Sequence, residues 1–258
     1  MRVFVINLAR SVERRAHVAR VLSEAEIPFA FFPGVDGTQE RQRMAPFYDE
    51  RRCARWLGRG LTDGELGCFL SHVLLWQHAV AIDEPLVVME DDINLLPGAA
   101  MALKLALASV ATHGIVRLSR SRRRSGRVVE RLPGGYSLVR FAYRLTGGQG
   151  YAVSPQAAQT LLRHCAPWIE PVDEYMDRFW VHGIEIVGLA PFPVVGRDPA
   201  LAPSEIGGRG RRDKLRGVAK LRRESVRLVD FARRSAWNTA AWVRNRRRPV
   251  WRSETPAA

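Results

Sequence analysis

The chain has 258 residues, of which 47% are hydrophobic, so it can form a substantial core and wholesale disorder is excluded. The formal net charge of +14 is concentrated at one end: residues 207–258 hold 16 Lys and Arg against 4 Asp and Glu, whereas residues 1–206 are nearly neutral. We therefore expect one domain over residues 1–206 and a basic appendage over residues 207–258.

Cysteine usage and hydropathy exclude several classes of protein. The three cysteines, Cys53, Cys68 and Cys165, are scattered and include no Cys-x-x-Cys pair. We therefore expect no disulfide framework, and we expect the protein to occupy a reducing compartment. No secretory signal follows Met1, and no apolar run approaches the roughly 18 residues of a membrane span. These features predict a cytoplasmic protein.

The first 37 residues predict a strand–helix–strand unit. "RVFVINL" at 2–8 is apolar and β-branched, as in a buried strand, and residues 12–25 carry apolar side chains at helical spacing. A second short strand within residues 29–37 runs into a Gly/Asp turn. This order predicts an α/β fold with a parallel sheet.

Residues 61–80, "LTDGELGCFLSHVLLWQHAV", predict a helix that begins with a capping box. Thr62 occupies the N-cap position and Glu65 follows three residues later. Apolar residues recur at helical spacing, and Glu65, Cys68 and His72 fall on a different stripe of the same helix.

Further elements follow along the chain. A buried strand, "LVVM", is predicted at 86–89 and a buried helix at 98–111. The remaining predicted strands are 114–118, 137–141 and 184–189, and the remaining predicted helices are 154–165 and 171–182. Residues 119–135 predict a basic, flexible loop, either a solvated insertion or a cover over anionic groups.

Three consecutive acids, Glu90, Asp91 and Asp92, come directly after the predicted strand at 86–89. Such a run lies at the carboxyl edge of a sheet, where α/β folds bind ligands. In extended chain Glu90 and Asp92 point the same way and Asp91 points opposite. Neighbouring carboxylates repel unless a cation joins them, and oxygen ligands suit Mg²⁺ or Mn²⁺. The alternative is a solvated acidic turn.

Other candidate residues have similarly ambiguous patterns. Arg14 and Arg15 begin the helix after the first strand, where phosphates are often bound, but they also suit a solvated helix face. His72 is a candidate for the site or a structural histidine. Asp173 and Asp177 lie one helical turn apart, and either could accept a proton from a hydroxyl.

These segments, taken in order, resemble glycosyltransferase family 25. The resemblance rests on "VFVINLARSVERR", "FPGVDG", "LTDGELGCFLSHVLLWQHAV", "PLVVMEDDINL", "GGQGYAVSPQAAQTLL" and "PVDEYM", and it covers roughly residues 2–195. It implies a GT-A type fold with a single Rossmann-like sheet. It also implies a nucleotide-sugar donor, usually UDP-galactose, a divalent metal such as Mn²⁺, and inversion at the anomeric carbon.

The resemblance also implies roles for individual residues. Asp92 would bind the metal, and Glu90 or Asp91 would help hold the metal or the donor ribose. The residues expected near the donor or acceptor are Asn7, Arg10, Arg14, Glu65, Ser71, His72 and Gly148. Asp173 would be the catalytic base, with Asp177 as its rival. Residues 190–206 contain no histidine for a further metal ligand, which leaves Asp198, Glu205 or a site without a further protein ligand.

The basic tail, residues 209–252, combines arginines with apolar residues at near-helical spacing and with three tryptophans. This pattern predicts a helix on an anionic membrane surface, here the cytoplasmic face of the inner membrane. A lipooligosaccharide or other cell-surface glycolipid would then be the acceptor. The alternatives are a helix packed on the body and a nucleic-acid-binding segment.

The leading hypothesis is therefore an inverting, metal-dependent galactosyltransferase. Three rival functions stay open. One is the same reaction with UDP-glucose or UDP-N-acetylhexosamine, and another is a nucleic-acid-binding protein that acts through the tail. The third is an inactive relative that only binds acceptor.

Overall fold

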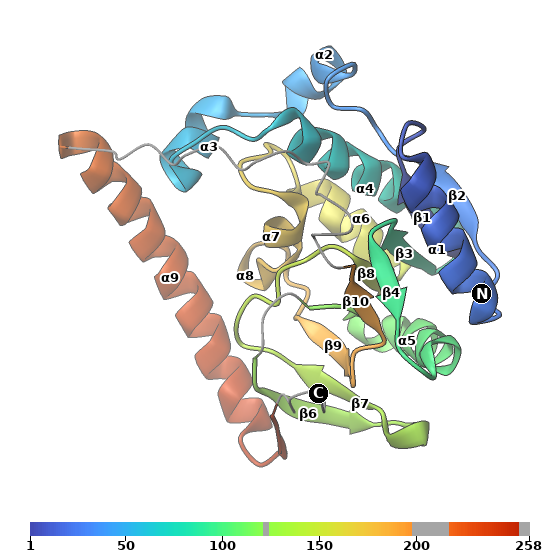
Figure 1. Ribbon diagram of the computed structural model, residues 1–258. Coiled ribbons are helices and arrows are strands. Elements are labelled where there is room, and N and C mark those ends of the chain that lie inside the picture. The colour runs from blue at the N-terminus through green and yellow to red at the C-terminus, as the bar shows by residue number, and fades with distance from the viewer. Residues whose placement is uncertain (121–123, 198–216, 253–258) are drawn as a thin grey trace.

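The computed structural model describes residues 1–120, 124–197 and 217–252 and has helices on both faces of a nine-stranded sheet (Figure 1). The strand order is β11-β6-β7-β9-β5-β8-β3-β1-β2. The strands are β1 (Val3–Asn7), β2 (Ala30–Pro33), β3 (Leu86–Glu90), β5 (Ile115–Arg117), β6 (Gly126–Arg131), β7 (Ser137–Arg140), β8 (Gly150–Val153), β9 (Val187–Ala190) and β11 (Val250–Trp251). A separate two-stranded sheet pairs β4 (Ile93–Leu95) with β10 (Val194–Gly196).

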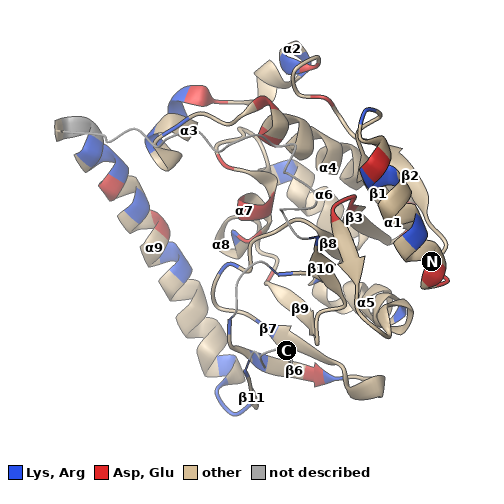
Figure 2. Cartoon of the chain, in the orientation of Figure 1, with Lys and Arg blue, Asp and Glu red and all other residues tan. Residues whose placement is uncertain are grey.

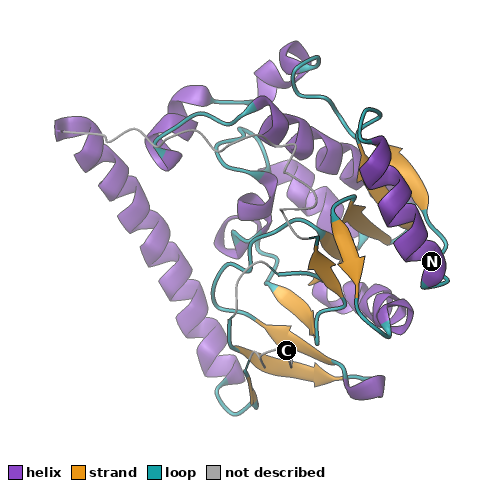
Figure 3. Ribbon diagram, in the orientation of Figure 1, coloured by secondary structure: helices purple, strands orange, loops and turns teal. Residues whose placement is uncertain are grey.

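The helices are distributed around this sheet, as Figure 3 shows by secondary structure. They are α1 (Val12–Glu24), α2 (Arg41–Met44), α3 (Glu50–Leu57), α4 (Asp63–Ile82), α5 (Ala99–His113), α6 (Pro155–His164), α7 (Val172–Met176), α8 (Phe179–His182) and α9 (Gly217–Asn245), with short 3₁₀ turns at Ala45–Phe47 and Pro133–Gly135. Within the described ranges, no helix is both long enough and apolar enough to span a membrane.

The middle of the sheet is buried on both faces, as strand β3 illustrates. Leu86 and Val88 pack in a cluster with α4 and α6, and Val87 and Met89 pack in another cluster with α1 and α5. All four side chains are fully buried. Because successive strand residues point to opposite faces, a continuous apolar run is what a strand between two helical layers requires.

The sheet is mixed, and this corrects the expectation of a purely parallel one. Strands β1, β2 and β3 are parallel to one another, but β8 lies antiparallel between β3 and β5. Gly150 at the start of β8 pairs with Met89 near the end of β3. The loop before β8 therefore reaches the edge of the sheet where the acids lie.

Several predicted elements are confirmed, and α4 is the clearest. The Thr62 hydroxyl accepts from the Glu65 N–H over 3.1 Å, and the Glu65 carboxylate accepts from the Thr62 N–H over 3.0 Å, which completes the capping box. Strands β1, β3 and β5 and helices α1 and α6 also lie within or close to their predicted ranges.

Two predictions were wrong in detail. Residues 126–131 are not loop but form β6, which pairs with β7 across a register shift between Val128 and Glu130. Its charged residues Glu130 and Arg131 are exposed, and Arg127 is partly exposed. The predicted helix at 171–182 is two short helices, α7 and α8. Helix α7 ends at Met176, and Asp177 is its C-cap residue. The buried carboxylate of Asp177 accepts a hydrogen bond from the Thr146 N–H.

The described part of the basic tail contacts the body. Helix α9 lies along one side of the molecule and packs against α3 and α8, and β11 pairs with β6 at the edge of the sheet (Figure 1). Figure 2 shows the positive residues distributed along α9 with few negative ones between them. The expected domain boundary, between residues 206 and 207, lies outside the described residues.

Candidate functional site

A pocket opens at the carboxyl ends of β1 and β3, and it contains about 720 Å³ of empty space including its mouth. It is lined by side chains from both strands, from the start of α1, from the loop after β2 and from α4. The lining residues are Ile6, Leu8, Arg10, Arg14, Gly34, Val35, Asp36, Gly37, Thr38, Gly64, Cys68, Ser71, Glu90, Asp91 and Asp92.

The middle acid, Asp91, connects the carboxyl ends of β1 and β3. One of its oxygens accepts from the Asn7 side-chain N–H over 2.7 Å, and the other accepts from Arg14 over 2.9 Å. The side chain is buried, at 8% exposed. Asn7 also donates to the Ser11 carbonyl, so it ties β1 and the start of α1 to the acids. These contacts give Asn7 and Asp91 a structural role at the base of the pocket.

The two arginines predicted near the donor both line the pocket. One terminal nitrogen of the Arg14 guanidinium donates to Asp91, and the other lies 3.5 Å from an Asp92 carboxylate oxygen. Arg10 pairs with Asp36 in the loop after β2 and is half exposed. The guanidinium groups therefore give this acidic pocket a positive side.

Glu90 and Asp92 are poorly stabilised as anions. Burial raises the pKa of Glu90 to about 7, helped by the nearby charges of Asp173 and Asp91. Burial likewise raises the pKa of Asp92 to about 6, with the charge of Glu90 as the next cause. One oxygen of Asp92 is buried with no hydrogen-bond partner. Both carboxylates therefore keep their protons to a higher pH than usual, and a cation bound between them would favour the ionised forms.

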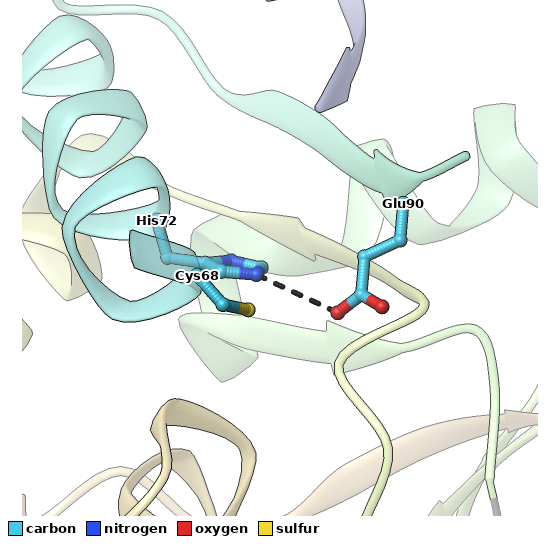
Figure 4. A group of neighbouring side chains, drawn as sticks. All are labelled: Cys68, His72 and Glu90. Atoms are coloured by element: carbon cyan, nitrogen blue, oxygen red, sulfur yellow. Dashed lines mark ion pairs between the residues drawn. The ribbon is translucent and has the colours of Figure 1, made fainter. Parts of the chain in front are cut away.

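His72 is fully buried on α4 and faces Glu90 (Figure 4). Its Nδ1 lies 2.8 Å from the Tyr151 hydroxyl, and its Nε2 lies 3.7 Å from a Glu90 oxygen with no hydrogen-bond partner. Burial lowers the pKa of His72 to about 3, with the charge of Arg117 adding to the effect. The imidazole is therefore neutral at pH 7 and forms no ion pair with Glu90.

The loop of residues 146–149 before β8, called the glycine loop below, lies against Glu90 and close to His72. A Cβ at Gly148 would lie 2.7 Å from a Glu90 oxygen, so only glycine fits without displacing the carboxylate. The loop is held by Asp173, which accepts from the Gly147 N–H over 3.1 Å, and by the buried Arg117, which donates to the Gly147 carbonyl.

Asp173 and Asp177 reach the same loop but differ in exposure. The side chain of Asp177 is 1% exposed, accepts from Thr146 and lies 3.7 Å from Arg117. Burial raises its pKa, and Arg117 opposes that shift. Asp173 is partly exposed, and its charge contributes to the raised pKa of Glu90. Of the two acids, Asp173 is the one that a ligand in solution can reach.

Two other predicted site residues have structural contacts. Both oxygens of Glu65 accept from Arg59 over 2.6 Å, and Glu65 is not among the pocket-lining residues. Ser71 does line the pocket, and its hydroxyl accepts from the Val35 N–H while donating to the Gly67 carbonyl. Ser71 therefore anchors the loop after β2 onto α4.

The donor set fits a divalent cation. Glu90 and Asp92 are carboxylates whose raised pKa values leave them in need of a counter-charge, and an Asp92 oxygen is buried without a partner. Asp91 already accepts from Asn7 and Arg14, which makes it the least suited of the three acids. The further candidates Asp198 and Glu205 lie outside the described residues.

Sequence reasoning missed Arg117 as a residue of the site. It is a buried arginine in the short strand β5, and it faces Asp177 and the glycine loop. A charged residue inside an apolar strand such as "IVRL" is the signal that could have identified it, because an arginine is buried only when it is paired.

Comparison with known proteins identifies the family to which the chain is similar. The family model described as "Glycosyltransferase family 25 (LPS biosynthesis protein)" matches residues 1–176. Procollagen galactosyltransferase 1 of Danio rerio is 32% identical over 189 residues, which cover 67% of this chain and 30% of that protein. Lipooligosaccharide biosynthesis protein lic2B of Haemophilus influenzae is 34% identical over 93 residues, 36% of this chain and 34% of that protein.

One similar protein carries a different description. The probable inactive glycosyltransferase 25 family member 3 of Rattus norvegicus is 30% identical over 220 residues, which cover 73% of this chain and 37% of that protein. The chain thus spans about a third of the length of the curated relatives it matches.

Proposed function

Because this chain belongs to glycosyltransferase family 25, we propose that it transfers a hexose from a nucleotide-sugar donor to a glycan acceptor. One observation carries the proposal: Arg10, Arg14, Glu90 and Asp92 line a single pocket at the carboxyl ends of parallel strands. Phosphates need positive groups, and open α/β sheets bind ligands at this edge.

The proposed fold type is GT-A, with a divalent ion, Mn²⁺ or Mg²⁺, held by Asp92 and Glu90. When bound, the ion would neutralise the charge that develops on the departing nucleotide diphosphate. Arg14, which lies between Asp91 and Asp92, would meet the same phosphates and keep the two acids in place. The unpartnered Asp92 oxygen supports this assignment.

The proposed donor is UDP-galactose, because one relative is named a galactosyltransferase. UDP-glucose and UDP-N-acetylhexosamine are the alternatives, since hexose identity depends on a few contacts in the pocket. The description of the matching family and the name of lic2B favour a lipopolysaccharide or lipooligosaccharide acceptor.

The proposed reaction inverts the anomeric centre in one displacement. Asp173 would accept the proton of the acceptor hydroxyl as that oxygen attacks the sugar, and the nucleotide diphosphate would leave. Asp173 is preferred to Asp177 because it is partly exposed, whereas Asp177 is buried against Thr146 and Arg117. Asp177 and Arg117 would position the glycine loop.

We also propose that α9 contacts an anionic membrane on the cytoplasmic side. The face of α9 toward the body is largely polar: Asp230 pairs with Arg178, and Asn238 bonds Arg140 and the Ala142 carbonyl. Large apolar side chains instead point to solvent, namely Leu221, Val226, Leu228, Val229, Phe231, Trp242 and Val243. Exposed arginines on the same helix suit anionic lipid.

The test is a panel of nucleotide sugars incubated with the protein, with and without Mn²⁺, while nucleotide diphosphate release is followed. We expect slow, metal-dependent hydrolysis of one donor and its loss in Asp92→Asn. Asp83→Asn is the matched control, because Asp83 is an exposed acid at the left-handed C-cap of α4, a conformation that Asn tolerates.

Two outcomes would contradict the proposal. Absence of metal-dependent UDP binding by calorimetry would exclude a donor site of this kind. UDP binding without any turnover, even with isolated lipooligosaccharide as acceptor, would place the chain with relatives such as the rat protein described as probably inactive.

A further inference from the structure

A second donor set lies beside the carboxylates, and its chemistry is different. The Cys68 sulfur, a His72 ring nitrogen and a Glu90 oxygen all lie within 4.8 Å of one another (Figure 4). Cys68 and His72 are four residues apart on α4 and therefore share a face, while Glu90 reaches them from the end of β3.

The unpartnered nitrogen of His72 is the independent evidence for a ligand here. The side chain is fully buried, yet its Nε2 has no hydrogen-bond partner and points toward Glu90 at 3.7 Å. A buried polar atom without a partner costs free energy, so a ligand at this position would be favoured.

The surroundings prepare His72 to act as a ligand. Metal binding requires a neutral imidazole with a free lone pair, and the contacts of the other ring nitrogen decide which nitrogen carries that lone pair. The Tyr151 hydroxyl lies 2.8 Å from Nδ1 and accepts from Trp76 Nε1 over 2.9 Å. Its oxygen can also accept an Nδ1–H, and this is the tautomer that directs the Nε2 lone pair at Glu90 and Cys68.

The spacing suits a tetrahedral ion. Bonds of about 2.0–2.3 Å to N, O and S at tetrahedral angles separate the donors by roughly 3.3–3.7 Å. The nitrogen and oxygen are already 3.7 Å apart, and the remaining separations, within 4.8 Å, need to shorten by up to about 1.5 Å, which side-chain rotation provides. Cys68 and Glu90 both line the pocket, so an ion can reach them from solvent.

We propose that Cys68, His72 and Glu90 form a binding site for a borderline-soft transition metal of the Zn²⁺ class, which shares Glu90 with the carboxylate set of Glu90 and Asp92 but adds sulfur and nitrogen donors. Sulfur and imidazole donors select Zn²⁺ or Co²⁺ over Mg²⁺ and Mn²⁺. Binding converts the Cys68 thiol to a thiolate and releases its proton to solvent. Glu90 belongs to both sets, so Zn²⁺ here competes with the ion proposed for the transfer reaction, but Zn²⁺ binding itself needs no nucleotide.

The experiment uses Co²⁺ as a spectroscopic probe on the full chain after treatment with a chelator. Wild-type protein should give a near-ultraviolet thiolate-to-cobalt charge-transfer band, and stoichiometric Zn²⁺ should abolish it. Cys68→Ser should lose the band and weaken Zn²⁺ binding, measured against a chromophoric chelator, by at least about tenfold, because even outer-shell ligand partners contribute that much.

Two control variants separate this site from other groups. Cys165→Ser removes a buried thiol elsewhere and should keep the band. Asp92→Asn should also keep the band while losing Mn²⁺-dependent UDP binding, so failure here and failure of the transferase proposal are distinguishable. A wild-type protein without the band, or a band that persists in Cys68→Ser, would overturn the proposal.

A second measurement covers the case in which Cys68→Ser does not fold. In wild-type protein, Zn²⁺ should slow the alkylation of Cys68 by iodoacetamide by at least about tenfold, followed by peptide mass spectrometry, because the alkylating agent needs a free thiolate. Mn²⁺ at the same concentration should give no protection. Equal alkylation with and without Zn²⁺ would refute the site.

Discussion

Asn7 at the end of β1 donates to Asp91 just after β3 over 2.7 Å, so the middle acid of the triplet is bonded across two parallel strands. Arg14 donates to the other oxygen of the same carboxylate over 2.9 Å. All three consecutive acids line the pocket, but Asp91 has both oxygens bonded within the fold, whereas Glu90 and Asp92 are poorly stabilised as anions.

This division predicts opposite effects for two similar substitutions. Asp91→Asn should lower the free energy of unfolding by about 1–3 kcal/mol, because it weakens charge-assisted hydrogen bonds in a buried position. Asp92→Asn should leave stability unchanged or raise it, because it removes a carboxylate that burial disfavours as an anion. Urea denaturation at pH 7.5 without metal measures both, and equal losses would contradict the division.

The raised pKa of Glu90 predicts a pH-dependent stability. The native state holds this proton up to a pH of about 7, against about 4.5 when unfolded, so ionisation of Glu90 destabilises the fold progressively as pH rises between these values. Glu90→Gln should therefore stabilise the metal-free protein by up to about 3 kcal/mol at pH 8 and by almost nothing at pH 4. Thermal unfolding across this pH range is the measurement. A gain that is the same at both ends would show that Glu90 ionises normally.

Close contact between Gly148 and Glu90 predicts a coupled pair. Gly148→Ala should displace the Glu90 carboxylate, because the new Cβ would lie 2.7 Å from its oxygen, and should weaken metal-dependent UDP binding by about tenfold. The same change in a Glu90→Asp background should have less effect, because the shorter side chain leaves room for the methyl group. Titration calorimetry on the four proteins of this cycle gives the coupling, and additive effects would exclude the contact.

Asp173 and Asp177 should differ in what they control. Asp173→Asn should lower turnover by about 10²–10⁴-fold with UDP affinity retained, as expected for loss of a general base. Asp177→Asn should mainly reduce stability, because it breaks a buried contact with Thr146 and leaves Arg117 without its carboxylate. Kinetics and thermal unfolding of both variants check this. Full activity in Asp173→Asn would remove it from consideration as the base.

The outward apolar face of α9 predicts binding to anionic vesicles. Wild-type protein should sediment with phosphatidylglycerol vesicles more than with phosphatidylcholine vesicles, and Leu228→Ser with Trp242→Ser should reduce that binding. Met101→Ser is the matched control, because Met101 is an equally exposed apolar residue on α5. No difference between the two lipids would argue against a membrane role for the helix.

Elements with a local signal were predictable from the amino-acid sequence. An apolar run, helical spacing and the capping box of Thr62 and Glu65 identified β3 and α4 and placed the acids at the carboxyl edge of the sheet, because each signal comes from residues close together in the chain. The order of the motifs likewise indicated the family that the comparison confirmed. Strand alternation did not predict the position of Asp91, because β3 ends at Glu90 and all three acids line the same pocket.

The tertiary structure alone decided which candidates share a pocket and which act as supports. Glu65 is held by Arg59, Asp91 by Asn7 and Arg14, and Asp177 is buried beneath the glycine loop. It also decided that Cys68 and His72 face Glu90 and that the apolar side chains of α9 point outward. These outcomes depend on contacts between residues far apart in the chain and on the burial that shifts their pKa values, and no local pattern encodes either.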